Sequence, residues 1–317
     1  MPVAPTLQEG IVTRSTGSWH EVSTDNATVP CKVPGRFRLT HQGETNPIAV
    51  GDRVRIQRLD DGSGLIEEVL PRKNKLVRRA AGRRVGIEHV IVANIDFAWV
   101  VQSCLLPKLN PGFVDRFLVM AGVYHIPAGL IVNKYDLVDD RIRDPVSFWC
   151  DLYEGIGYPV LRTSATTGMG TEQLSRELTD RITVLAGPSG VGKSSLLNTI
   201  EPGLELRTGE VSERTRKGTH VTTNAGLHAL SGGGFVIDTP GIREFGIVDV
   251  RPEELGHYFV EFVPHLDNCH YPNCTHDHEP GCAVIEAVDD GQVTEERWAS
   301  YLNILESIRQ GEKDTGR

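Results

Sequence analysis

The segment Gly187–Ser194, with the sequence GPSGVGKS, constrains the fold of this chain more than any other. It fits the pattern GxxxxGKS, follows an apolar segment at 182–185 and precedes a segment with helical periodicity at 193–200. In that context the glycines let backbone N–H groups surround a phosphate, and the start of the helix adds a favourable electric field. An ordinary glycine-rich turn is the competing interpretation, which the two flanking segments disfavour. The segment predicts an α/β domain with a phosphate-binding loop after a strand.

Two residues of this loop have expected roles in chemistry. We expect Lys193 to reach the β- and γ-phosphates of a nucleotide and to act in catalysis, and we expect the Ser194 hydroxyl to bind Mg²⁺. The nucleotide-binding residues predicted here are Gly187, Pro188, Ser189, Gly190, Val191, Gly192, Lys193, Ser194 and Ser195.

The base is indicated by the sequence Asn133, Lys134, Tyr135, Asp136, which follows a predicted strand at 130–132. The Asp136 carboxylate can accept both N–H groups of the N1/N2 edge of guanine, whereas adenine offers no such pair of donors. We expect Ser164 and Ala165, at the end of a strand at 160–163, to place a backbone N–H near guanine O6. The predicted nucleotide is therefore GTP or GDP, and a P-loop ATPase is the alternative.

A third element, Asp238-Thr239-Pro240-Gly241, ends a predicted strand at 235–237 and fits the pattern DxxG. Asp238 is expected to hold Mg²⁺ through water, and the Gly241 N–H to sense the γ-phosphate. The polar segment 214–223 has the position of a switch loop. Ile242 stands where Ras-type enzymes place a glutamine that orients water. Either hydrolysis is slow or another group takes that role, and His220 is the nearest candidate. The competing interpretation is that this histidine has no part in catalysis.

The order of these elements is unusual, because residues 133–136 and 164–165 precede the phosphate-binding loop. In a Ras-like GTPase the corresponding two segments follow the phosphate-binding loop. The same sheet can form if the chain is circularly permuted, since the termini of a domain often lie close together. Predicted strands and helices alternate, as in an α/β domain with a largely parallel sheet. The strands are predicted at 97–101, 130–132, 160–163, 182–185 and 235–237, and the helices at 113–123, 145–156, 170–178 and 193–200.

The first 70 residues predict short strands at 11–13, 28–33, 36–39, 52–56 and 64–69. Five such strands favour an OB-type barrel, although an SH3-like barrel would show the same pattern. A basic linker is predicted at 72–79, with Arg83 and Arg84. The formal net charge of −9 argues against a nucleic-acid partner, but residues 1–84 carry a net +5 and residues 85–317 a net −14. The positive charge lies where an RNA partner would bind.

Three cysteines and a histidine lie close together at 269–282, within a predicted helical segment. Three thiolates and one imidazole have the composition of a closed tetrahedral metal site, so we expect one structural Zn²⁺. His270 and His278 could compete with the proposed histidine ligand. The predicted ligands are Cys269, Cys274, His276 and Cys282.

Neither a long apolar run nor a signal peptide is visible, so we expect a cytoplasmic monomer without membrane contacts. Three modules are predicted: a barrel with its basic linker at 1–84, a permuted GTPase domain at 85–248 and a helical zinc-binding domain at 249–317.

With these motifs the chain resembles the ribosome small subunit-dependent GTPase A family (RsgA, also called YjeQ). The resemblance implies a GTPase of late 30S subunit maturation that binds 16S rRNA and is stimulated by the subunit. It also implies that His220 positions water and that Thr222 binds Mg²⁺, while Val221 departs from the run of threonines common in the family. The alternative from another class is a non-catalytic RNA-binding adaptor. The resemblance rests on 133–136, 187–195, 218–223, 238–241 and the Cys/His cluster.

Overall fold

The computed structural model describes residues 7–25, 27–34, 47–79, 88–206, 226–238 and 250–315. The chain divides into two compact units. The module boundaries expected above, at 84/85 and 248/249, stay a prediction. Unit 1 comprises Met1–Ala98, Glu172–Ala186 and Leu197–Arg243, and unit 2 comprises Trp99–Thr171, Gly187–Leu196 and Glu244–Arg317.

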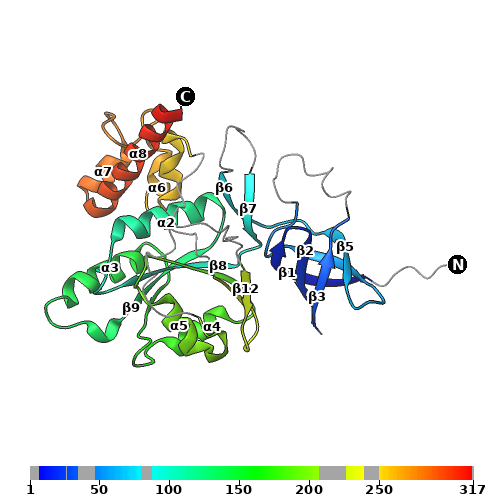
Figure 1. The fold of residues 1–317 in the computed structure, drawn as a ribbon. Coiled ribbons are helices and arrows are strands. Elements are labelled where there is room, and N and C mark those ends of the chain that lie inside the picture. Colours follow the sequence, from blue (N-terminus) through cyan, green and yellow to red (C-terminus); the bar gives the residue numbers. More distant parts are fainter. Residues whose placement is uncertain are drawn as a thin grey trace. The chain divides into compact units, whose positions relative to one another are not determined.

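In unit 1, five strands close into a barrel in the order β1-β2-β3-β5-β4 (Figure 1). β3 and β5 pair in parallel, and the other neighbours are antiparallel. Alternate side chains point inward and form the core, because successive residues of a strand face opposite sides. This confirms the predicted OB-type barrel. The strands are β1 (Leu7–Thr16), β2 (Trp19–Ser23), β3 (Thr28–Lys32), β4 (Arg53–Arg58) and β5 (Gly64–Val69), and the buried core includes Val12, Val22, Val29, Val54, Ile56 and Ile66.

One barrel strand differs from the sequence-based expectation. β2 was not predicted, because His20 and Val22 are its inward-facing residues and only one of them is aliphatic. The strand predicted at 36–39 lies outside the described residues.

The predicted basic linker is wrong over part of its length. Residues Lys75–Arg79 form strand β6, which pairs antiparallel with β7 (Glu88–Ala93). The apolar pair Leu76 and Val92, both buried and directly opposite in this ladder, explains why the segment is ordered as a strand. A run of basic residues therefore hid an apolar position facing a protein core.

The second sheet has six strands in the order β10-β9-β8-β11-β13-β12. The pairs β10–β9 and β11–β13 are parallel, while the edge strand β12, which was not predicted, is antiparallel to β13. The predicted alternation of strands and helices is confirmed. The elements are β8 (Phe97–Ser103), α2 (Pro111–Val123), β9 (Ala128–Asn133), η1 (Tyr135–Leu137), α3 (Arg143–Gly155), β10 (Val160–Arg162), α4 (Thr171–Leu178), β11 (Ile182–Ala186), α5 (Lys193–Ile200), η2 (Pro202–Leu204), β12 (Gly226–Ala229) and β13 (Phe235–Asp238).

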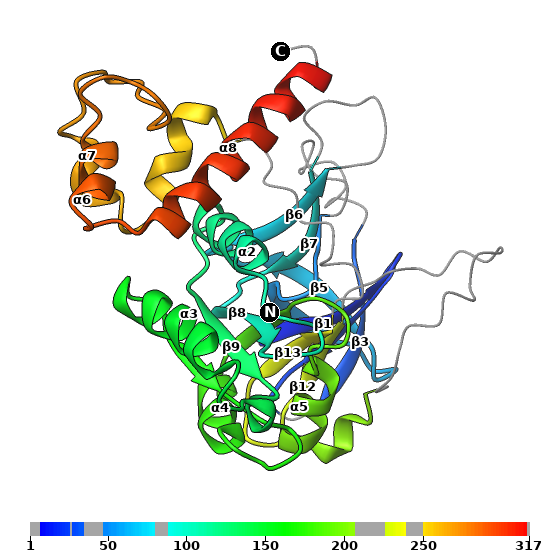
Figure 2. The same cartoon turned by 90° about the vertical axis from the view of Figure 1, so that its left-hand side faces the viewer.

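The C-terminal part of unit 2 is helical, as predicted. It contains η4 (Pro252–Tyr258), α6 (Val263–Leu266), α7 (Ala283–Asp289) and α8 (Glu295–Thr315). α2 and α8 lie side by side in both views of the ribbon (Figures 1 and 2), and Val119 of α2 belongs to the same apolar cluster as Phe259 and Tyr301. The C-terminal helices are thus packed on α2 and share its core. Among the described residues, no helix has the length and apolar character needed to cross a membrane.

A buried ionic network strengthens this packing. Arg297 of α8 is 1% exposed and donates hydrogen bonds to Asp115 of α2 and to both carboxylate oxygens of Glu261. Tyr153 also donates to Asp115, at 2.7 Å. Burial lowers the pKa of the guanidinium, but the two carboxylates outweigh that effect and raise it, so Arg297 stays charged. Buried charges that are shielded from solvent are stable only while they are paired with opposite charges.

Candidate active site and metal centre

The predicted phosphate-binding loop joins β11 to α5, and two of its glycines are required by close contacts. A Cβ atom on Gly187 would lie 2.2 Å from the carbonyl oxygen of Val101. A Cβ on Gly192 would lie 2.3 Å from the Nδ2 atom of Asn133, and Gly192 has a φ of +94° that larger residues rarely adopt. Only glycine fits at these two positions, so the backbone can take the path that surrounds a phosphate.

Lys193 begins α5, and its side chain folds back over the loop. Its Nζ atom donates to the carbonyl oxygens of Gly187 at 2.8 Å and Pro188 at 2.9 Å. The ammonium is therefore held at the mouth of the loop, where the phosphates of a nucleotide would lie. Ser194 and Ser195 follow in the first turn of the helix and are half-buried.

Asn133 connects the predicted base-binding segment to this loop. It is 1% exposed, and its Nδ2 atom donates to the carbonyl oxygen of Val191 at 2.8 Å, across 58 residues of sequence. The Oγ1 atom of Thr163 donates to Asn133 Oδ1 at 3.2 Å, so both ends of the amide are bonded. Thr163 was not predicted to have this role, because the contact depends on β10 lying beside β9.

Asp136 lies in η1, exposed to solvent, with one carboxylate oxygen held in place. The hydroxyl of Ser164 donates to Asp136 Oδ1 at 2.5 Å and accepts the backbone N–H of Thr167 at 3.1 Å. The sequence suggested only a backbone N–H from this segment, and the structure adds a side chain that orients the carboxylate. Tyr135 bonds through its backbone N–H to the carbonyl oxygen of Thr163 at 3.0 Å. Ala165 follows Ser164 directly.

The segments 133–136, 164–165 and 187–195 thus meet in unit 2. The remaining predicted residues are not placed in the same way. Asp238 is the last residue of β13, but its side chain lies outside the described part of the structure. The residues His220, Thr222 and Gly241 also lie outside the described residues.

The four predicted metal ligands come together at the C-terminal end of unit 2. The ligand atoms of Cys269, Cys274, His276 and Cys282 all lie within 4.8 Å of one another. The Nδ1 atom of His276 is 3.6 Å from Cys269 Sγ and 3.4 Å from Cys282 Sγ. A tetrahedral metal with bonds of about 2.3 Å to sulfur places its ligand atoms roughly 4 Å apart, which these positions fit.

The structure groups His276, and not His270 or His278, with the three cysteines. It is 4% exposed, whereas His278 is exposed and faces Asp277 with an Nδ1–Oδ2 distance of 3.2 Å. Burial lowers the pKa of His276, which favours the neutral imidazole that a metal requires. Burial raises the pKa of the Cys274 thiol to about 12, so a bound cation is needed to stabilise its thiolate.

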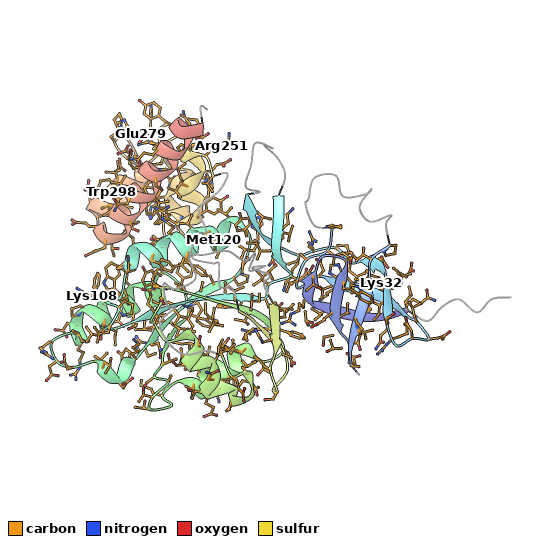
Figure 3. The ribbon with its side chains drawn as sticks, in the orientation of Figure 1. Lys32, Lys108, Met120, Arg251, Glu279 and Trp298 are labelled. Carbon is orange, nitrogen blue, oxygen red and sulfur yellow. The ribbon has the colours of Figure 1, made fainter. Side chains whose placement is uncertain are left out.

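Glu279 orders the loop that carries these ligands (Figure 3). Its carboxylate accepts the backbone N–H and the hydroxyl of Thr275, at 2.7 and 2.5 Å, and the backbone N–H of Asp277 at 3.1 Å. Burial alone would raise the pKa of Glu279, but these hydrogen bonds lower it to about 2. Trp298 of α8 donates from its indole to the carbonyl oxygen of His276 at 2.9 Å. The ligand loop is therefore anchored to the helical core.

An Asn-Lys-x-Asp segment, a serine after the next strand and then a phosphate-binding loop, in this chain order, define the class of circularly permuted P-loop GTPases. Comparison with known sequences agrees: the RsgA GTPase profile matches residues 69–248, and the RsgA N-terminal domain profile matches residues 9–66. The chain belongs to the RsgA GTPase family and is a GTP hydrolase.

Individual relatives match along nearly the whole chain. "Small ribosomal subunit biogenesis GTPase RsgA" of Bacteroides fragilis is 43% identical over 304 residues, covering 96% of this chain and 98% of the relative. The Flavobacterium psychrophilum protein of the same name is 41% identical over 302 residues, covering 94% of this chain and 92% of the relative. The crystal structure of YjeQ from Thermotoga maritima has a TM-score of 0.81 and 38% sequence identity, and the match covers 95% of this chain and 98% of YjeQ. YloQ, described as a circularly permuted GTPase, has a TM-score of 0.76 and 28% identity, covering 96% of each chain.

Proposed function

We propose that this chain is a GTPase of small ribosomal subunit biogenesis that acts late in maturation of the 30S subunit, as a cytoplasmic monomer. The chain binds 16S rRNA with the barrel and with the basic residues at 72–79, Arg83 and Arg84. The 30S subunit stimulates GTP hydrolysis by the chain. The relatives named for small-subunit biogenesis support this role, since they match more than nine-tenths of the chain.

The observation that carries the GTPase part is the hydrogen bond from Asn133 to Val191, because it joins the base segment to the phosphate loop. In our proposal the Asp136 carboxylate recognises the N1/N2 edge of guanine, with Ser164 and Ala165 beside O6. The N–H groups of the loop 187–192 and the Lys193 ammonium bind the phosphates.

Mg²⁺, held by Ser194, Thr222 and Asp238, would neutralise negative charge that develops on the β- and γ-phosphates. Gly241 senses the γ-phosphate, and His220 positions the attacking water. These assignments rest on the sequence motifs and on the resemblance to the family.

Zn²⁺ is the metal that we propose for the Cys/His cluster. Three thiolates and one imidazole are a donor set that this ion favours, and four protein ligands leave no position for a substrate. The site is therefore structural. It holds the loop 269–282 on the helices of the C-terminal part of unit 2.

The experiment is phosphate release from GTP by the full chain, with and without purified 30S subunits. We expect slow release alone and a large increase with subunits, and Lys193→Ala should abolish both. A non-catalytic adaptor would release no phosphate in either condition. An ATPase would show ATP competing with GTP on equal terms, and hydrolysis that ignores the subunits would contradict the ribosomal role.

A further inference from the structure

The loop between β8 and α2, residues 104–110, was not part of any motif, yet it contacts the base-binding segment at several atoms. Cys104 is buried, with 2% of its surface exposed. Its backbone N–H donates to the carbonyl oxygen of Asn133 at 3.2 Å. Its Sγ atom lies 2.8 Å from the carbonyl oxygen of Lys134, in the position of a donor. The Nζ atom of Lys134 in turn donates to the carbonyl oxygen of Leu106. One short loop therefore holds Lys134 at its backbone and at its side chain.

The backbone of Lys134 requires such support. It has φ 59° and ψ 34°, in the left-handed region that a residue with a side chain rarely adopts. Conformations of this kind persist where the surrounding contacts leave no alternative. Lys134 lies between Asn133, which is fixed to the phosphate loop, and Asp136, so its conformation determines where the Asp136 carboxylate points.

The thiol is suited to this task because it remains protonated. Burial raises the pKa of Cys104 above its ordinary value, so the sulfur keeps the proton that it donates to the carbonyl oxygen. A serine hydroxyl could donate in the same way, whereas alanine and valine could not.

We propose that Cys104 is a positioning residue for guanine recognition: its S–H group holds the Lys134 carbonyl and thereby aims the Asp136 carboxylate at the base. The Cys104 side chain touches neither the base nor the phosphates, and its thiol acts through the Lys134 carbonyl. The inference rests on the proposed guanine site.

The test measures KM and kcat of the full chain with GTP and with ITP, which lacks the N2 amino group that Asp136 is expected to bind. The variants are Cys104→Ala and Cys104→Val, which both remove the donor, one leaving a space and the other filling it. Cys104→Ser keeps a donor. Cys150→Ala, at another fully buried cysteine in α3, is the matched control.

We expect the two variants without a donor to raise KM for GTP about fivefold to tenfold, the loss of roughly one hydrogen bond, while kcat at saturating GTP changes less than about twofold. The preference for GTP over ITP should fall by a similar factor. Cys104→Ser should restore both values, and Cys150→Ala should leave both unchanged.

An unchanged KM and GTP/ITP preference in both donor-free variants would overturn the inference, and so would a serine variant that behaves like alanine. If Cys104→Ala does not fold, the valine and serine variants decide the question by themselves. A wild-type chain that fails to prefer GTP over ITP would contradict the proposed guanine site instead, so the two failures are distinguishable.

Discussion

Replacing Arg297 by methionine tests how the C-terminal helices are attached to α2. The guanidinium and the Asp115 carboxylate are each 1% exposed, and the Glu261 carboxylate is 7% exposed. Arg297 also lies over the ring of Phe259, 4.5 Å from its centroid. Methionine fills much of the same volume but leaves two buried carboxylates without a cation.

Removing one partner of a buried ion pair costs about 3–5 kcal/mol, because the remaining charge is left uncompensated. That is a large share of the roughly 5–15 kcal/mol that stabilises a typical domain. Since Arg297 lies on α8 and Asp115 on α2, we expect the loss to fall on the C-terminal helices. We expect the barrel strands to keep their stability.

Native-state hydrogen exchange, read by peptide, is the appropriate assay because a chain with several modules does not unfold in one step. In Arg297→Met the opening free energy of peptides from η4 and α8 should fall by about 3 kcal/mol or more. Arg176→Met is the matched control, since Arg176 pairs with Glu172 on an exposed helix face, and should change stability by less than about 0.5 kcal/mol. A change in Arg297→Met as small as in the control would show that the buried ion pair does not stabilise the C-terminal helices.

Three further predictions concern metal and protons. Chelation should release one Zn²⁺ and expose the amides of α7 and α8 to exchange, with the barrel unchanged, as metal analysis and hydrogen exchange would show. Glu279→Gln should lower the chelator concentration that releases the metal, since a neutral amide accepts hydrogen bonds from the Thr275 and Asp277 amides more weakly. Burial lowers the pKa of His20, partly offset by Asp52, so protonation below about pH 6.5 favours the unfolded state. The barrel amides should lose protection between pH 7 and 5.5, and less so in His20→Asn.

The phosphate loop, the Asn-Lys-x-Asp segment and the metal ligands could be predicted because each is a local pattern with its chemistry in a few adjacent residues. The alternation of strands and helices in the second sheet was readable for the same reason. Strands such as β8, β9 and β11 are continuous apolar runs, the helices carry apolar residues at helical spacing, and each such segment belongs to one element.

What could not be predicted depends on contacts between distant segments. The bond from Thr163 to Asn133 exists because two strands are neighbours, and the Cys104–Lys134 contact needs a loop with no motif of its own. Arg297 is an ordinary helical arginine in the sequence, and only its burial against Asp115 identifies it as structural. β6 was hidden because its basic residues outnumber its apolar ones.

We propose that the Asp136 carboxylate recognises guanine in a site assembled from three separate segments. The most direct test is hydrolysis of GTP and XTP by the wild type and by Asp136→Asn. Asparagine offers an N–H donor where the carboxylate offered an acceptor, so it matches the O2 atom of xanthine and mismatches the N2 amino group of guanine. We expect kcat/KM for GTP to fall by about 100-fold or more and XTP to become the better substrate. A variant that still prefers GTP over XTP would contradict it.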